Sequence, residues 1–168
     1  MHQGGEHIGP RLERGLGYVA LGPAEATVAL LHELALARGS YLWVTERAME
    51  PPANGGRVLR LTTLGTSGGL DPKRLGDLRT SVAGFVAGDA SGLVVLDCLD
   101  YLVLHNGPER VLRVLADLHD EVSVHGGSLI VFVDARVANP RLVAWLEREL
   151  DPLPREDLLH SESDGLPA

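Results

Sequence analysis

The fold of this chain can be inferred from LVVLDCLDYL, residues 93–102, an apolar run that ends in two carboxylates, Asp97 and Asp100. Leu and Val without alternating polar residues are typical of a strand buried on both faces, as in the middle of a parallel sheet. Open α/β sheets bind ligands outside the carboxyl ends of their strands, so an acid there is a candidate for chemistry. In nucleotide hydrolases such an acid binds magnesium beside a phosphate loop, but the motif G-x-x-x-x-G-K-[ST] occurs nowhere in this chain.

Strands alternate with helices along the chain. A long amphipathic helix is predicted at residues 107–125, and a second wholly apolar strand follows it at 129–133. This alternation predicts an α/β fold, a three-layer sandwich with a mostly parallel sheet of about four or five strands and helices on both faces. The other predicted elements are helices at 23–38, 72–87 and 140–150, with Asp71 and Asn139 as N-caps of the last two, and strands at 41–45 and 57–63.

Length and composition predict one globular domain. Of the 168 residues, we expect 1–17 to form a flexible arm, 18–150 a single α/β domain, and 151–168 a mobile acidic tail. Because the net charge is −8, the protein would gain little from the release of counterions that drives nucleic-acid binding, which argues against a nucleic-acid partner. The lone Cys98, the absence of a basic and apolar leader, and the short apolar runs predict a cytoplasmic protein with no membrane segment.

Four stretches between residues 39 and 150 carry a family resemblance: GSYL at 39–42, LDCLDYLVLHNG at 96–107, RVL at 110–112 and GGSLIV at 126–131. Through these stretches the chain resembles the domain-of-unknown-function family 835. The family usually has Gly and Glu where this chain has Cys98 and Asp100, and its middle section is longer than residues 45–72 here.

The resemblance implies a degenerate relative of RecA- and KaiC-type ATPases, which keeps the strand with the magnesium-binding acid and has lost the phosphate loop. That loop would follow the strand at 41–45, where Glu46 to Pro51 stand instead. Two acids and a proline at this place would repel phosphates. Family members often accompany receiver, sensor or histidine-kinase domains, which implies a role in signalling.

Two interpretations apply to the strand-end acids. Asp97 and Asp100 could bind a divalent cation or position a water, because hard cations prefer oxygen ligands. Alternatively, Asp97 accepts backbone hydrogen bonds from the segment that follows it, an interpretation we favour because the phosphate loop is missing. Asp134 ends the strand at 129–133 and carries the same ambiguity. Tyr101 and Asn106 complete the matched motif as candidate ligand-binding residues with no assigned role.

Two other patterns carry little chemistry. Residues 65–69, GTSGG, match the nucleophile elbow G-x-S-x-G, but the elbow needs a helix that starts at the Ser, and Leu70 to Pro72 intervene here. The histidines that could complete a triad are His105, His119, His125 and His160, and none has a compelling context. His119 and His125 are six residues apart on one predicted helix, so they fall on different faces and no metal site is expected.

We therefore expect a non-enzymatic regulatory or protein-interaction domain with a signalling association, no cofactor and a protein partner, with a homodimer as a further option. One alternative is a nucleotide- or anion-sensing module that uses Arg47, Arg136 or the amides of residues 65–69 as donors. A second alternative is a STAS-like regulatory module, since VVLD, a helix and GGSLIVFV also resemble the core of that fold. Trp43 and Trp145 are interpreted as packing residues.

Overall fold

The computed structural model describes residues 12, 15–22, 29–30, 33, 40–48, 56–65, 68–89, 91–134, 136 and 138–153. Its described strands form one seven-stranded sheet in the order β4-β3-β2-β5-β6-β1-β7, and every neighbouring pair is parallel. The strands are β1 (Gly17–Leu21), β2 (Tyr41–Thr45), β3 (Gly56–Leu61), β4 (Gly69–Leu70), β5 (Leu93–Leu96), β6 (Ser128–Val133) and β7 (Asp151–Pro152). The described helices are α2 (Leu75–Gly88), α3 (Leu99–Asn106), α4 (Pro108–Val124) and α5 (Pro140–Glu149).

Strand β5 is the centre of the sheet, as the apolar run predicts. All four of its side chains are fully buried, and it pairs with β2 on one side and β6 on the other. Both neighbours are buried along their whole length. The predicted strands at 41–45 and 129–133 and the parallel β5–α4–β6 arrangement are therefore confirmed.

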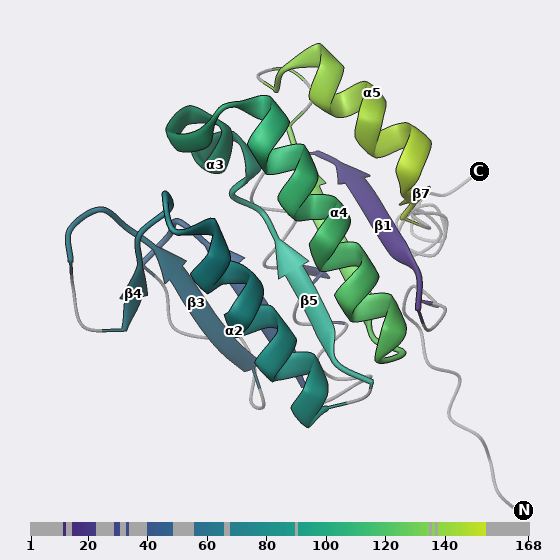
Figure 1. Ribbon diagram of the computed structural model, residues 1–168. Coiled ribbons are helices and arrows are strands. Elements are labelled where there is room, and N and C mark those ends of the chain that lie inside the picture. Colours follow the sequence, from purple (N-terminus) through teal and green to yellow (C-terminus); the bar gives the residue numbers. More distant parts are fainter. Residues whose placement is uncertain are drawn as a thin grey trace, which may run out of the picture.

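The two faces of the sheet have separate cores. Helices α2, α3, α4 and α5 cover one face (Figure 1), where they pack on inward-facing residues such as Val44, Val94 and Val131. The other face carries Tyr41, Trp43 and Val95, against which Leu30 packs from a helical segment. This is the α/β sandwich that the alternating elements predict. Within the part of the chain that the structure describes, no helix has both the length and the apolar character needed to cross a membrane.

Several elements differ from the sequence prediction. Within the described residues the sheet has seven strands, whereas the sequence predicts four or five. Strand β1 lies next to Gly-rich residues, and β4 and β7, with two residues each, are too short for a periodic signal. Helix α3 is not predicted, because it follows β5 within one apolar stretch and a continuous run of Leu and Val does not distinguish a strand from a buried helix.

The chain bends between these two elements at Asp97 and Cys98, and Gly107 separates α3 from α4 with a φ of 80°. Asn139 caps α5 as predicted, its side chain accepting a hydrogen bond from the Arg141 amide at 2.9 Å. Asp71, by contrast, accepts from the Lys73 amide at 2.9 Å and forms a turn, so α2 begins later, at Leu75.

Residues predicted to lie in the arm and the tail contribute to the sheet. Strand β1 begins at Gly17, the last residue of the predicted arm at 1–17, and Leu12 within that arm is buried. Strand β7 opens the predicted tail at 151–168, and the Leu153 amide donates to the Val19 carbonyl at 2.9 Å. Most of the predicted helix at 23–38 lies outside the described residues, among which 29, 30 and 33 are helical.

Among the described strands, the strand order creates one place where the connections of two neighbouring strands lead apart. From β1 to β4 the chain moves toward one edge of the sheet, and from β5 to β7 it moves toward the other. The neighbouring strands β2 and β5 are thus followed by connections that lead apart, to β3 on one side and to β6 on the other. In open α/β sheets, ligands bind at the carboxyl ends of such strand pairs.

The start of β6 leaves no room for a side chain at Gly127. A Cβ there would lie 2.7 Å from the carbonyl oxygen of Gly92, which also accepts the Ser128 amide at 3.1 Å. We expect Gly127→Ala to lower the free energy of unfolding by about 1–3 kcal/mol, measured by urea denaturation. Gly84→Ala is the matched control, because Gly84 lies in α2 with open space around its Cα. It should raise stability by about 0.5–1 kcal/mol, and equal effects of the two variants would contradict this packing.

Candidate functional site

The candidate site lies at the carboxyl ends of β2 and β5, where the connections to β3 and β6 lead apart. Val44 pairs with Leu96 at the end of the ladder, so Thr45 and Asp97 come next on adjacent strands. The Asp97 amide donates to the Val44 carbonyl at 3.3 Å, and the Cys98 thiol lies 3.6 Å from the same oxygen. The strand-end position predicted for Asp97 is therefore observed.

The carboxyl of Asp97 is sequestered. Neither of its oxygens is accessible to solvent or has a hydrogen-bond partner among the described residues. Burial raises the pKa of Asp97 above 3.8. The Thr45 hydroxyl and the Trp43 indole lie near the carboxyl and partly offset this increase. Neither group is placed well enough to form a hydrogen bond with it. The charge of Arg47 also lowers this pKa, and that of Glu46 raises it.

Trp43 is the polar neighbour that sequence reasoning assigned to packing alone. Its ring is completely buried on the face opposite α2–α5, and its indole N–H has no partner among the described residues. An unpaired buried donor and an unpaired buried acceptor thus lie side by side, an arrangement that costs free energy until one of them finds a partner. The prediction that Asp97 accepts backbone hydrogen bonds from the following segment is wrong, because neither carboxyl oxygen accepts a hydrogen bond from any described residue.

Asp100 has different surroundings from Asp97. Partial burial raises its pKa, and the charge of Asp134 at the end of β6 adds to the increase. Asp134 is itself held by Arg136, whose Nε and Nη2 donate to its two oxygens at 3.0 and 2.8 Å. These bonds and the Arg136 amide lower the pKa of Asp134 to about 2. The two acids of the motif therefore interact with different partners, and Arg136, a candidate anion donor, is engaged by Asp134.

Tyr101 and Asn106 hold α3 in place. The Tyr101 and His105 rings contact each other edge to face, with centroids 4.7 Å apart. The Asn106 side-chain amide donates to the carbonyls of Leu102 and Pro72, each at 2.9 Å. The second bond joins the end of α3 to the turn that precedes α2, so this predicted ligand-binding residue connects two helices.

The remaining sequence candidates do not converge. Ser67 of the elbow-like pattern lies outside the described residues, as does His160, and the next helix starts only at Leu75. His125, the residue that follows α4, contacts the Glu121 carbonyl of that helix at 3.0 Å. Within the described ranges, no three His, Cys, Asp or Glu side chains are grouped closely enough to hold a metal ion.

Sequence reasoning missed a groove between the first turns of α4 and helix α5, two elements that lie beside each other on the outer side of the molecule (Figure 1). The groove has a volume of about 360 Å³. Leu112, Ala144 and Trp145 supply its apolar part, and Glu109, Arg141 and Arg148 supply its charges. The residue that could have indicated the groove from the sequence is Trp145, because the chain has only 4% aromatic residues and this one lies on the predicted helix at 140–150.

The fold and site define an α/β domain with a wholly parallel sheet and a buried acid at the central strand end. The family model of DUF835, described as a protein of unknown function, matches residues 26–150. The chain therefore belongs to the DUF835 family, as the sequence resemblance predicts. Comparison with curated protein sequences gives no significant match.

Asp97 should make the protein less stable as the pH rises. Because burial raises the pKa of Asp97 above 3.8, the native state holds this proton more tightly than the unfolded state does. Its contribution to stability is then lost as the pH rises from 3.8 through the raised pKa. We expect Asp97→Asn to be more stable than the wild type at about pH 7 and equal to it at about pH 3, by urea denaturation. Asp120→Asn, an exposed acid on α4, is the control, and the same pH dependence in both variants would contradict the buried carboxyl.

The pKa of Asp134 should be shifted downward, opposite to the shift of Asp97. Carboxyl ¹³C NMR should give its pKa as about 2 in the wild type. In Arg136→Gln the pKa should move toward the ordinary value of 3.8, because the two side-chain donors are lost. Arg141→Gln removes an exposed guanidinium on α5 and should leave Asp134 unchanged. A wild-type pKa near 3.8 would show that the ion pair does not form in solution.

Proposed function

We propose that this chain is a non-enzymatic regulatory domain that binds another protein through the groove between α4 and α5. The observation that carries the proposal is Trp145, a half-buried indole that lines this groove. Tryptophan and arginine are the residues that most often dominate the energy of protein interfaces. The groove supplies both, on a helix whose opposite side packs on the core through Leu142 and Leu146.

The shape of the groove fits a helical partner. Its two walls are helices, so an amphipathic helix could place its apolar side chains against Leu112, Ala144 and Trp145. Pro108 and Asn139 fix the first turns of the two walls, since each opens its helix. A wall whose helix ends are fixed loses little freedom when a partner binds.

The charges of the groove favour an acidic partner. Arg141 and Arg148 outnumber Glu109 among its lining residues, although the whole chain carries a net charge of −8. Arg148 also lies 3.3 Å from Glu149, but both side chains are largely exposed. Such surface ion pairs contribute little stability, so Arg148 can exchange Glu149 for a partner carboxylate at small cost.

The strand-end acids also support a role without chemistry. Asp134 is neutralised by Arg136, and the oxygens of Asp97 are closed off from solvent. The signalling association rests on the family resemblance. The nucleotide- or anion-sensing and STAS-like alternatives stay predictions.

The test is a displayed library of 16-residue peptides selected against the full chain. We expect enriched peptides to combine acidic residues with Leu or aromatic residues, because they must fit the Arg side chains and the apolar part of the groove. Fluorescence polarisation should show that Trp145→Ala and Arg141→Glu each weaken binding by at least about tenfold, or 1.4 kcal/mol.

Matched controls are Leu104→Ala, an exposed apolar residue on α3, and Arg57→Glu, an exposed base on β3. Both controls should bind like the wild type. Peptides without acidic enrichment, or binding that survives both groove variants, would overturn the proposal. A dimer that dissociates in Trp145→Ala during sedimentation would assign the groove to a second copy of the chain instead of another protein.

A further inference from the structure

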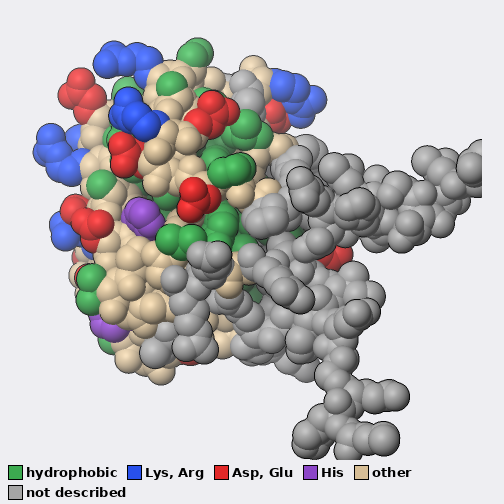
Figure 2. Space-filling view, turned by 90° about the vertical axis from the view of Figure 1, so that its right-hand side faces the viewer, with side chains coloured by type: hydrophobic (Ala, Val, Ile, Leu, Met, Phe, Trp, Pro, Cys, Tyr) green, Lys and Arg blue, Asp and Glu red, His purple; other side chains and the backbone are tan. Residues whose placement is uncertain are grey.

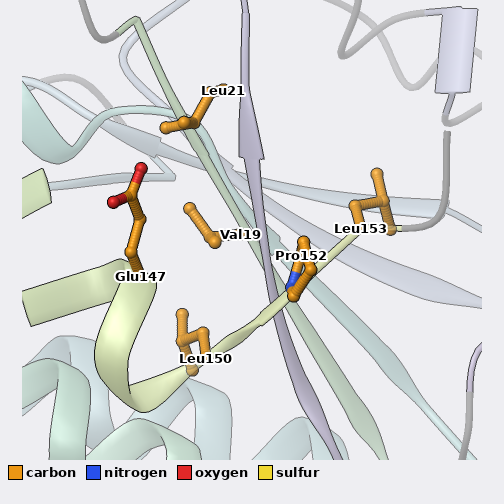
Figure 3. A pocket seen from close by; sticks show the side chains of 6 residues that line it. All are labelled: Val19, Leu21, Glu147, Leu150, Pro152 and Leu153. Atoms are coloured by element: carbon orange, nitrogen blue, oxygen red, sulfur yellow. The ribbon is translucent and has the colours of Figure 1, made fainter. Parts of the chain in front are cut away.

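A second hollow lies on the other side of α5, where this helix meets the edge of the sheet (Figure 3). Its volume is about 370 Å³, which falls within the range of small-molecule sites. The lining residues are Val19 and Leu21 from β1, Glu147 and Leu150 at the end of α5, and Pro152 and Leu153 at β7.

The hollow arises from unequal strand lengths. Strand β1 has five residues, but β7 pairs only with Tyr18 and Val19. The last hydrogen bond between the described parts of these segments joins the Leu153 amide to the Val19 carbonyl at 2.9 Å. Leu21 therefore extends past the end of β7, and the final turn of α5 forms the opposite wall through Glu147 and Leu150.

The chemistry of the lining is simple. Five of the six side chains are apolar, and Glu147 is the one that carries a charge. Figure 3 shows the Glu147 carboxylate extending from α5 on the same side as Val19 and Leu21. The adjacent base, Arg148, contacts Glu149 at 3.3 Å rather than Glu147. Within the described part of the chain, Glu147 is thus a carboxylate without an ion pair beside an apolar surface.

The chain next to Glu147 also carries more negative than positive charge. Glu149 and Asp151 follow Glu147 closely, and Arg148 is the only base in this stretch. Seen from the side of α5 and β1, hydrophobic and acidic side chains lie next to each other in the middle of the face, and Lys and Arg side chains lie at its top and left (Figure 2). A carboxylate ligand would be repelled here, whereas a cation would be attracted.

We propose that this hollow binds a small molecule that has an apolar body and a cationic amine. The apolar body packs against Val19, Leu21 and Leu150, and the ammonium group lies beside Glu147. This site is distinct from the groove of the proposed function, because Glu147 and Leu150 line only the hollow while Arg141 and Trp145 line only the groove. The proposal therefore stands independently of whether the groove binds a protein.

The test compares three probes with the same eight-carbon body, n-octylamine, 1-octanol and n-octanoate, against the full ¹⁵N-labelled chain at neutral pH. The amide signals of Val19, Leu21, Glu147 and Leu150 should shift with octylamine, and its Kd should be at least tenfold lower than that of octanoate. Glu147→Gln should reduce the preference for the amine over octanol to less than twofold, since it removes the charge and keeps the shape.

Asp151→Asn is the matched control, because it removes an exposed charge that follows α5, does not line the hollow and is in no ion pair among the described residues. It should keep the preference for the amine. Leu21→Trp should fill the hollow and therefore weaken the binding of octylamine and of octanol to the same extent. A thermal melt shows whether this variant is folded. If that variant unfolds, the Glu147→Gln comparison alone decides the proposal.

The proposal is overturned if octylamine and octanoate bind equally or if neither binds. It is also overturned if Glu147→Gln and Asp151→Asn have the same effect, which would indicate general attraction of amines to an acidic surface. Signal shifts confined to residues away from β1 and the end of α5 would overturn it as well.

Discussion

The burial of β5 on both faces is the constraint on which the rest of the structure depends. Leu93 and Val95 belong to one core, and Val94 and Leu96 belong to the other. A strand with no polar side is stable only between two neighbouring strands and under cover on both faces. The pairing with β2 and β6 satisfies the first requirement, and the helices on one face with Leu30 on the other contribute to the second.

The same constraint explains the unusual state of Asp97. It is the first residue after a strand that has no solvent contact, and the sheet places it next to Thr45 and Trp43 rather than next to water. A charged carboxylate in this position is costly, so its pKa rises. Asp134 follows the neighbouring strand β6 but turns toward Arg136 and solvent, and its pKa falls. Two acids in the same kind of position thus acquire opposite proton affinities from their neighbours.

Helix α5 presents two different surfaces because helical periodicity separates its residues. Arg141 and Trp145 contribute to the groove beside α4, whereas Glu147 and Leu150 contribute to the hollow beside β1. One surface has excess positive charge and the other has a single negative charge. This helix is therefore the element on which both proposed binding activities depend, and it is anchored between them by Leu142 and Leu146 in the core.

Local patterns in the chain were enough for the buried strands, the amphipathic α4, the Asn139 cap and the family, because each depends on residues close in sequence. They also placed Asp97 at a strand end. They did not reveal β1, whose partner β6 lies more than a hundred residues away, or the two-residue β7. The neighbours of Asp97, the groove and the hollow were likewise hidden, because each brings together segments that are joined only through the order of strands in the sheet. Periodicity and caps are local properties of the chain, whereas a pKa or a binding surface is set by contacts between distant residues.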